Sequence, residues 1–177
     1  MLKNVIDFRK ELLKKFSYSP TSRQSKLFVM LVDFVFSKDY QTLFLMKGYA
    51  GTGKTSAISA LVKTLKETEK KSVLLAPTGR AAKVISVYSK VPAYTIHKKI
   101  YFPKKQQNGS VDFVLQTNKH KNTIFIVDEA SMIPDRPQNG KLFENGSLLD
   151  DLISYVYSGY RCKLILIGDT AQLPPVK

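Results

Sequence analysis

A glycine-rich segment constrains the fold of this chain more than any other feature. Residues 48–55 read Gly-Tyr-Ala-Gly-Thr-Gly-Lys-Thr and match the pattern G-x-x-x-x-G-K-[S/T]. Glycines allow the backbone to wrap closely around phosphate oxygens, and the N–H groups that open the following helix face the anion. An apolar run at 42–46 precedes the segment and a helical pattern at 56–65 follows it. We therefore predict a buried strand, a phosphate-binding loop and a helix, in that order.

Residues of this loop have separate chemical tasks. The Lys54 ammonium would lie at the β- and γ-phosphates, and the Thr55 hydroxyl would bind Mg²⁺. The other nucleotide-binding candidates supply backbone N–H groups or room for the phosphates, and they are Gly48, Ala50, Gly51, Thr52 and Gly53. The alternative, a glycine-rich turn without a ligand, leaves the flanking strand and helix unexplained. The predicted ligands are ATP and Mg²⁺.

Apolar runs and helical patterns alternate along the chain. Three further runs, at 73–76, 124–127 and 164–167, have the length of buried strands. Helical spacing also marks 23–36, and Ser147 is placed to cap another helix. Short apolar runs separated by helices favour a mostly parallel sheet with helices on both faces. The predicted fold class is therefore α/β.

One basic and polar segment, 103–122, interrupts this alternation. Asn108-Gly109 is a hairpin-turn signal, and apolar residues alternate with polar ones over 111–115. We predict a β-hairpin inserted into the core domain. A second irregular segment, 134–146, is expected to be a surface loop.

Two adjacent carboxylates follow the apolar run at 124–127. If that run is a strand of a parallel sheet, Asp128 lies at the carboxyl edge, where such sheets bind ligands. Asp128 would hold Mg²⁺, and Glu129 would orient and deprotonate the attacking water. Adjacent acids also occur at helix starts and in loops, but here they follow a strand in a chain that has a phosphate-binding loop.

Two glutamines have both a structural and a functional interpretation. Gln172 follows the run at 164–167 and can hydrogen-bond a γ-phosphate or its attacking water; the alternative is a polar turn before Pro174-Pro175. Thr21 and Gln24 have the spacing of a helix capping box, and the Gln24 amide could also pair with the adenine edge. Both interpretations of Gln24 can hold together.

Charge points to a polyanionic partner. The 177 residues carry 28 Lys and Arg against 14 Asp and Glu, a net charge of +14, which favours nucleic acid first and an anionic membrane second. Eleven cations fall within 61–110 against two acids, and they are Lys63, Lys66, Lys70, Lys71, Arg80, Lys83, Lys90, Lys98, Lys99, Lys104 and Lys105. For any single lysine a solvated surface position is an equal alternative.

Cysteine content and hydropathy favour one intracellular domain. A content of 44% hydrophobic residues suits one sizeable core, and the single cysteine, Cys162, enters an apolar run as a core thiol would. No apolar run approaches the roughly 18 residues of a membrane span. We expect a cytoplasmic protein that does not contact a membrane.

Five motifs in a fixed order resemble one family. They are GYAGTGKT at 48–55, LLAPTGRAA at 74–82, TIH at 95–97, IVDEASMI at 126–133 and GDTAQLPPV at 168–176. The set resembles the RecD/Dda-like DNA helicases of superfamily 1. The resemblance implies a RecA-like P-loop domain, ATP bound between two such domains, and 5′-to-3′ movement on single-stranded DNA. It assigns Gln24 to adenine, Lys54 and Thr55 to phosphate and Mg²⁺, Asp128 and Glu129 to Mg²⁺ and water, and Gln172 to the γ-phosphate.

The resemblance also assigns contacts to DNA. The residues matching the DNA-tracking segments are Pro77, Thr78, Gly79, Arg80, Thr95 and His97. For His97 alone, a packed or capping histidine would be the simpler interpretation. Tyr101-Phe102 and the hairpin occur where relatives carry a strand-separating element, so the pair is either a base-stacking surface or a buried anchor.

The domain expected from 1–177 is a single RecA-like ATP-binding domain with a helical lead over 1–40. The chain ends at Lys177, so the second RecA-like domain and its γ-phosphate arginines are expected elsewhere. We hypothesise weak hydrolysis by this chain alone, because such arginines contribute about 10³ to 10⁵ in rate. The alternatives are a P-loop ATPase with a non-DNA partner and a nucleic-acid-binding module with a vestigial ATP site. The oligomeric state stays open.

Overall fold

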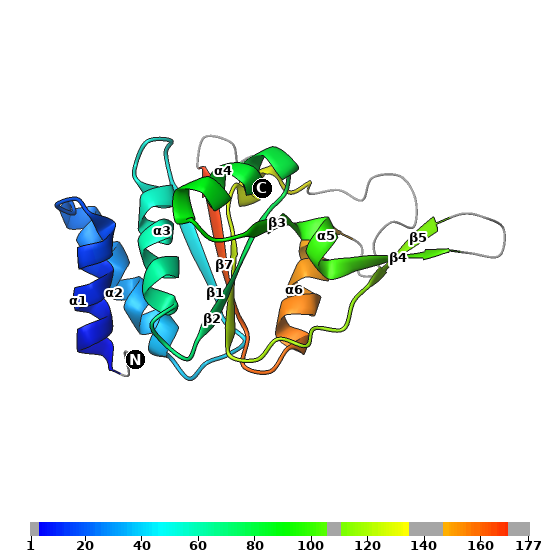
Figure 1. Ribbon diagram of the computed structural model, residues 1–177, viewed down its shortest axis with the longest axis horizontal. Helices are drawn as coiled ribbons and strands as arrows, with labels where there is room; N and C mark the ends of the chain where they lie inside the picture. Colours follow the sequence, from blue (N-terminus) through cyan, green and yellow to red (C-terminus); the bar gives the residue numbers. More distant parts are fainter. Residues whose placement is uncertain (1–3, 106–110, 135–146, 170–177) are drawn as a thin grey trace, which may run out of the picture.

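The computed structural model describes residues 4–105, 111–134 and 147–169. Its centre is a five-stranded sheet with the order β1-β7-β6-β2-β3, in which every neighbouring pair is parallel. The strands are β1 (Leu43–Gly48), β2 (Lys71–Ala76), β3 (Ala93–Thr95), β6 (Thr123–Val127) and β7 (Lys163–Asp169). Figure 1 shows them running in one direction, toward the loop between β1 and α3. The predicted mostly parallel sheet is confirmed.

The two central strands carry the most apolar sequence. All five residues of β6 are buried, and the first six of β7 are buried as well. Burial on both faces explains why these strands read as continuous apolar runs. β1, at one edge of the sheet, alternates instead: Met46 is buried, whereas Leu43 and Leu45 are 45% and 49% exposed.

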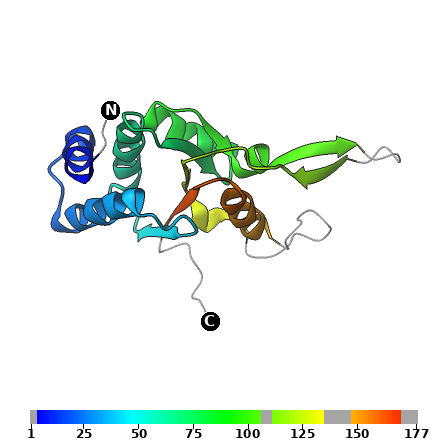
Figure 2. The same cartoon turned by 90° about the horizontal axis from the view of Figure 1, so that it is seen from below.

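Helices cover both faces of the sheet, as Figures 1 and 2 show. The apolar sides of α1 (Val5–Phe16), α2 (Ser22–Phe36), α3 (Lys54–Leu65) and α4 (Gly79–Ser89) pack in one core cluster with alternate strand residues. On the opposite face, α5 (Ile96–Ile100) and α6 (Leu148–Ser158) form a second cluster with the remaining strand residues. The two clusters follow from the alternation of side chains along each strand.

Local capping fixes where several helices begin. The Asn4, Thr21 and Ser147 side chains accept hydrogen bonds from the third backbone N–H of α1, α2 and α6. At α2 the capping box is complete, because the Gln24 side chain returns a bond to the Thr21 backbone. The predicted caps at Thr21 and Ser147 are thus confirmed.

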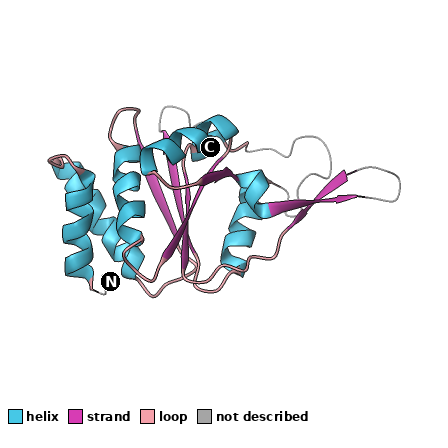
Figure 3. Cartoon of the chain, in the orientation of Figure 1, coloured by secondary structure: helices cyan, strands magenta, loops and turns pink. Residues whose placement is uncertain are grey.

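The predicted hairpin is present and projects away from the sheet (Figure 3). Its strands are β4 (Tyr101–Lys105) and β5 (Val111–Leu115), so it begins two residues earlier than expected. Tyr101 is buried and its hydroxyl donates a 2.5 Å hydrogen bond to the fully buried Asp151 carboxylate of α6. Phe102, which points to the other side of the strand, is 43% exposed. Tyr101 is therefore the buried anchor, and Phe102 is free to contact a partner.

Some elements were not predicted. They are β3, α4, α5 and the short 3₁₀ turn η1 (Ala130–Met132).

The cation-rich segment 61–110 does not form one surface. Lys70 and Lys71 lie where β2 begins, whereas Arg80 and Lys83 lie on α4, which follows the other end of β2. Most of the loop expected at 134–146 and the turn Asn108-Gly109 lie outside the described residues.

Cys162 is buried, with 1% of its surface exposed, and burial raises the pKa of its thiol. The prediction of a packed core thiol is confirmed. Among the described residues, no helix is long and apolar enough to cross a membrane.

Candidate active site

The phosphate-binding loop joins β1 to α3 at the carboxyl edge of the sheet. Gly51 and Gly53 have φ angles of 77° and 84°, in the left-handed region that favours glycine. Gly53 is the N-cap residue of α3, so the helix opens with Lys54 and Thr55. Backbone N–H groups at the start of this helix have no partner within the helix and are suited to an anion.

Lys54 crosses over the loop. Its Nζ donates to the carbonyl oxygens of Gly48, at 2.6 Å, and of Tyr49, at 2.8 Å. The Thr52 hydroxyl donates to the same Tyr49 carbonyl at 2.8 Å, which closes the turn. The ammonium is therefore held at the mouth of the loop, within reach of an anion bound by the helix.

Gln24 links α2 to the loop. Its Oε1 accepts from the Thr21 backbone N–H at 3.0 Å, and its Nε2 donates to the Thr52 carbonyl at 3.0 Å. A Cβ at Gly53 would lie 2.8 Å from Nε2, so Gly53 is also needed for this close approach. The capping role of Gln24 is observed, and each amide atom keeps one further hydrogen-bonding position.

Asp128 and Glu129 follow β6 at the same edge. Asp128 is 9% exposed, and burial, the largest influence, raises the pKa of its carboxyl; Glu129 raises it further, whereas Lys54 and a backbone hydrogen bond lower it. The Glu129 N–H donates to Asp128 Oδ1 at 3.0 Å. Glu129 has a φ of 54°, which is uncommon for a residue with a side chain. Such backbone strain occurs at functional sites, where it directs a side chain.

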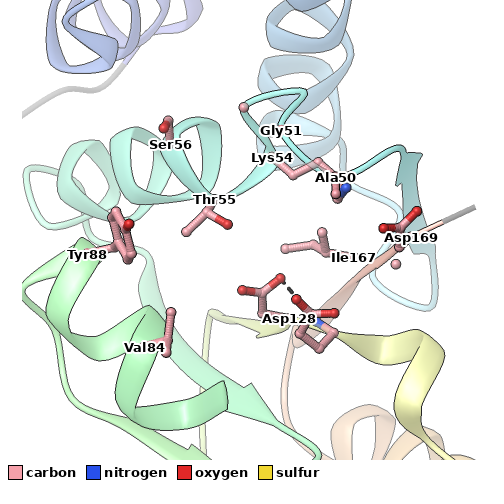
Figure 4. A pocket seen from close by; sticks show the side chains of 13 residues that line it. Ala50, Gly51, Lys54, Thr55, Ser56, Val84, Tyr88, Asp128, Ile167 and Asp169 are labelled. Carbon is pink, nitrogen blue, oxygen red and sulfur yellow. Dashed lines mark hydrogen bonds between the residues drawn. The ribbon is translucent and has the colours of Figure 1, made fainter. Parts of the chain in front are cut away.

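These residues line one cleft of about 500 Å³, shown in Figure 4. Two segments far apart in the sequence meet along it: Lys54 and Thr55 come from the start of α3, and Asp128 and Glu129 follow β6. The sequence reasoning missed several lining residues, namely Ser56, Val84, Tyr88, Ile167 and Asp169. Asp169 could have been found, because it is an acid two residues after a predicted strand; in the structure its Cα is opposite Gly48.

The residues assigned to DNA lie at the same edge, where β2 and β3 end and the helices α4 and α5 begin. Thr78 caps α4, its hydroxyl accepting from the Ala81 N–H at 3.2 Å. Thr78 and Arg80 line a smaller cleft of about 230 Å³ together with Thr55, Asp128 and Glu129. The two clefts therefore share the side chains assigned to Mg²⁺ and water.

The second assigned DNA segment lies on the next strand. Thr95 ends β3, opposite Ala76 of β2, and its hydroxyl caps α5 by accepting from the Lys98 N–H. His97 is exposed in the first turn of α5, with its ring 5.8 Å from that of Tyr101, so it is not the capping residue. Pro77 and Gly79 flank Thr78; Gln172 lies outside the described residues.

A comparison with models of protein families shows to which family the chain belongs. The family model described as AAA domain matches residues 34–177, and so covers every strand of the sheet. The chain belongs to this AAA domain family. The matched region contains the phosphate-binding loop and the acids of β6, but not α1 or the Gln24 segment of α2.

Relatives of this AAA domain include much longer proteins. An ATP-dependent RecD2 DNA helicase of Deinococcus radiodurans is 30% identical over 135 residues, which are 76% of this chain and 16% of the helicase. An uncharacterized protein of Methanocaldococcus jannaschii is 34% identical over 143 residues, 75% of this chain and 11% of that protein. The chain thus spans under a fifth of the length of these two relatives.

A solved structure has the same fold. It is a structure of two coordinating Pif1 helicases that concerns DNA unwinding at forked double-stranded DNA. A chain of that structure aligns with this chain with a TM-score of 0.53 and 22% sequence identity. The alignment covers 90% of this chain and 36% of that chain. The RecA-like fold is thereby confirmed. The family match and the RecD2 relative confirm the resemblance of this AAA domain to superfamily 1 helicase motor domains.

Proposed function

We propose that this chain is the ATP-binding motor domain of a DNA helicase, which couples ATP hydrolysis to 5′-to-3′ movement on single-stranded DNA. The observation that carries the proposal is the pair of adjoining clefts at the carboxyl edge. One contains the phosphate-binding loop, the other contains Thr78 and Arg80, and Asp128 and Glu129 line both. The polarity rests on the family resemblance.

The donor set fits a magnesium ion that is shared with phosphates. Mg²⁺ prefers oxygen ligands and is usually held by one or two side chains together with phosphate oxygens and water. Thr55 and Asp128 supply a hydroxyl and a carboxylate in the same cleft. Among the described residues no cluster of three His, Cys, Asp or Glu side chains could hold a metal by itself. When bound, the ion would neutralise charge that develops on the phosphates.

The side chains divide the remaining work. Lys54 turns its ammonium from the Gly48 and Tyr49 carbonyls toward the β- and γ-phosphates. Glu129 orients the attacking water and accepts its proton. The Glu129 N–H bond to Asp128 Oδ1 keeps the two carboxylates in a fixed relation. Gln24 positions the loop through Thr52 and presents the rest of its amide to adenine.

Coupling to DNA follows from the shared wall of the two clefts. Arg80 is exposed at the start of α4 and suits a phosphate of the DNA backbone, and Thr78 offers a hydroxyl and a nearby helix start. Asp128 and Glu129 line the same cleft as Thr78 and Arg80, so a movement of either acid during hydrolysis would change the surroundings of the DNA segment. Thr95 and His97 extend the same path over β3 and α5, and exposed Phe102 is available for base stacking.

A second RecA-like domain would complete the site. Arginines from such a domain would reach the γ-phosphate, and Gln172 would respond to it from this domain. The longer relatives support this arrangement, since this chain matches only part of each.

The test is steady-state ATP hydrolysis by the chain joined to its native C-terminal continuation, with and without single-stranded DNA. Strong stimulation by DNA that disappears in Lys54→Ala would support a DNA-dependent motor. Brisk hydrolysis that ignores DNA would contradict it and would favour an ATPase with a non-DNA partner. Failure to bind Mg-ATP would favour a module with a vestigial site.

A further inference from the structure

The amino edge of the sheet, opposite the ATP cleft, is built from three adjacent loops. They precede β2, β6 and β7 and run together at the bottom of Figure 1. Backbone hydrogen bonds join them: the Lys71 N–H donates to the Asn122 carbonyl at 3.0 Å, and the Asn122 N–H donates to the Tyr160 carbonyl at 2.9 Å. The Tyr160 N–H in turn donates to the His120 carbonyl. Segments distant in sequence thus form one continuous surface.

Cations dominate this surface. Each of the three loops contributes, and we define the amino-edge surface as Lys70, Lys71, Lys119, Lys121 and Arg161. Within the described part of the chain none of the five forms an ion pair. Burial and the Arg161 charge lower the pKa of Lys70, and burial together with Lys99 and Lys71 lowers the pKa of His120. The Arg161 charge therefore repels Lys70, and no described acid lies within ion-pair distance of any of the five cations.

A cleft of about 380 Å³ lies beside two of these five cations, Lys70 and Arg161. Its lining includes Tyr40, Lys70, Asn122 and Arg161, with Glu69 as its one acid among the described residues. The Arg161 guanidinium lies 5.5 Å from the centre of the Tyr40 ring and 5.1 Å from that of Tyr160, which is 58% exposed. Cations combined with aromatic rings are the surface chemistry that single-stranded nucleic acids use.

Backbone conformation supports a built site at this cleft. Asn122 and Arg161 have φ angles of 50° and 53°, in the left-handed region. Asparagine adopts this region readily, whereas for arginine it is uncommon. The exposed Arg161 side chain lies beside the Tyr40 ring, and both line the cleft together with Lys70.

We propose that the amino-edge surface is a second nucleic-acid site that binds the phosphodiester backbone. An extended row of unneutralised cations fits a polymer with a charge at each residue, and the arginine fork fits phosphate oxygens. The five residues of β6 separate this surface from Asp128, a span of about 17 Å at roughly 3.3 Å per residue. The site therefore acts independently of the nucleotide and is distinct from the path over Thr78 and Thr95.

The test measures affinity for a single-stranded oligonucleotide and for a duplex as a function of salt, without ATP. The variant Lys71→Gln/Lys119→Gln/Lys121→Gln changes three exposed side chains. The slope of log K against log salt should fall by about 2 for the single strand and about 3 for the duplex, if each lysine neutralises one phosphate. The ligand that loses the larger fold in affinity at one fixed salt concentration identifies the strandedness that the surface prefers. Arg161→Asn, which suits the left-handed backbone, should give a smaller loss of the same kind.

The matched control is Lys10→Gln/Lys14→Gln/Lys26→Gln, three exposed lysines of α1 and α2 with the same change in net charge. Its slope should stay near that of the wild type. Equal losses in the two triple variants, or no loss in either, would overturn the proposal. A further arm uses poly-glutamate: loss of its binding with unchanged nucleic-acid binding would assign the surface to an acidic protein and overturn the proposal. Because ATP is absent, the result is separate from the hydrolysis test of the motor function.

Discussion

The two edges of the central sheet carry charge in different ways. At the carboxyl edge, acids and a cation share one cleft: Asp128, Glu129 and Asp169 face the loop that holds Lys54. At the amino edge, five cations come from three loops, and two of them, Lys70 and Arg161, line a cleft in which Glu69 is the one acid among the described residues. The first edge has opposite charges placed for one small ligand, and the second has like charges spread along a surface.

Strand direction produces this difference. All neighbouring strands of the sheet are parallel, so residues that follow strands meet at one edge and residues that precede them meet at the other. The carboxyl edge depends on individual backbone and side-chain positions, so single changes there should have large effects. At the amino edge the contributions of separate cations should add, so single changes there should be small.

The largest expected effect is on hydrolysis, at the carboxyl edge. Glu129→Gln removes the proton acceptor and keeps the size of the side chain and a hydrogen-bonding group. In the chain joined to its C-terminal continuation, the hydrolysis rate should fall by about 10² to 10⁴, with ATP affinity nearly unchanged. Parallel loss of binding and hydrolysis would mean that Glu129 is structural.

Asp128→Asn should weaken Mg²⁺-dependent nucleotide binding without lowering the stability of the fold. Loss of the carboxylate should weaken Mg²⁺-dependent nucleotide binding by about 10- to 100-fold, the effect of losing a charged ligand. Because burial raises the pKa of Asp128, ionisation of the folded protein costs free energy, and this cost disappears in the amide. The melting temperature should therefore be equal or higher at pH 7. A clear decrease would show that the carboxylate stabilises the fold.

Two glycine substitutions in the loop test its geometry. Gly51→Ala meets no atom within 4 Å and should cost about 1–2 kcal/mol of folding free energy through its left-handed φ. Gly53→Ala has the same cost and also places a Cβ 2.8 Å from Gln24 Nε2, so it should destabilise more and break the link to α2. Denaturant unfolding of both variants gives the comparison; equal losses would remove the role of that close approach.

Lys163 provides a specific test at the amino edge. Its Nζ donates to the Phe34 and Ser37 carbonyls at the end of α2, and burial lowers its pKa to about 8. Between pH 8 and 10.5 the unfolded chain binds this proton more than the folded chain does, so stability from this group rises with pH. The melting temperature of wild type relative to Lys163→Met should increase from pH 7 to 10. A constant difference would contradict the lowered pKa.

Much of the fold follows from local sequence. Continuous apolar runs identify the inner strands β2, β6 and β7 because inner parallel strands are covered on both faces. The edge strand β1 also has such a run, although Leu43 and Leu45 are exposed. β3 could not be predicted, because a strand of three residues, Ala-Tyr-Thr, is too short to show a pattern. The Tyr101-Phe102 pair stayed undecided because only the strand register shows which ring faces the core.

The site was predictable where a motif imposes local geometry. Lys54, Thr55, Asp128 and Glu129 lie in one cleft because each follows a strand of the same parallel sheet. Two features depend on tertiary contacts instead. The bond from Gln24 to Thr52 joins residues 28 apart, and the amino-edge surface joins Lys70, Lys121 and Arg161, so neither has a signal in a single window of sequence.

The most direct test of the account is calorimetric titration of Mg-ATP into three forms of this chain: wild type, Lys54→Ala and Lys71→Gln/Lys119→Gln/Lys121→Gln. Lys47→Ala, an exposed lysine of β1, is the control for loss of one cation. We expect Lys54→Ala to lose about 10²-fold or more in affinity, because charge-assisted bonds to phosphate disappear, while the other variants bind like wild type. Unchanged affinity in Lys54→Ala, or an equal loss in the amino-edge variant, would contradict the assignment of ATP to the carboxyl edge.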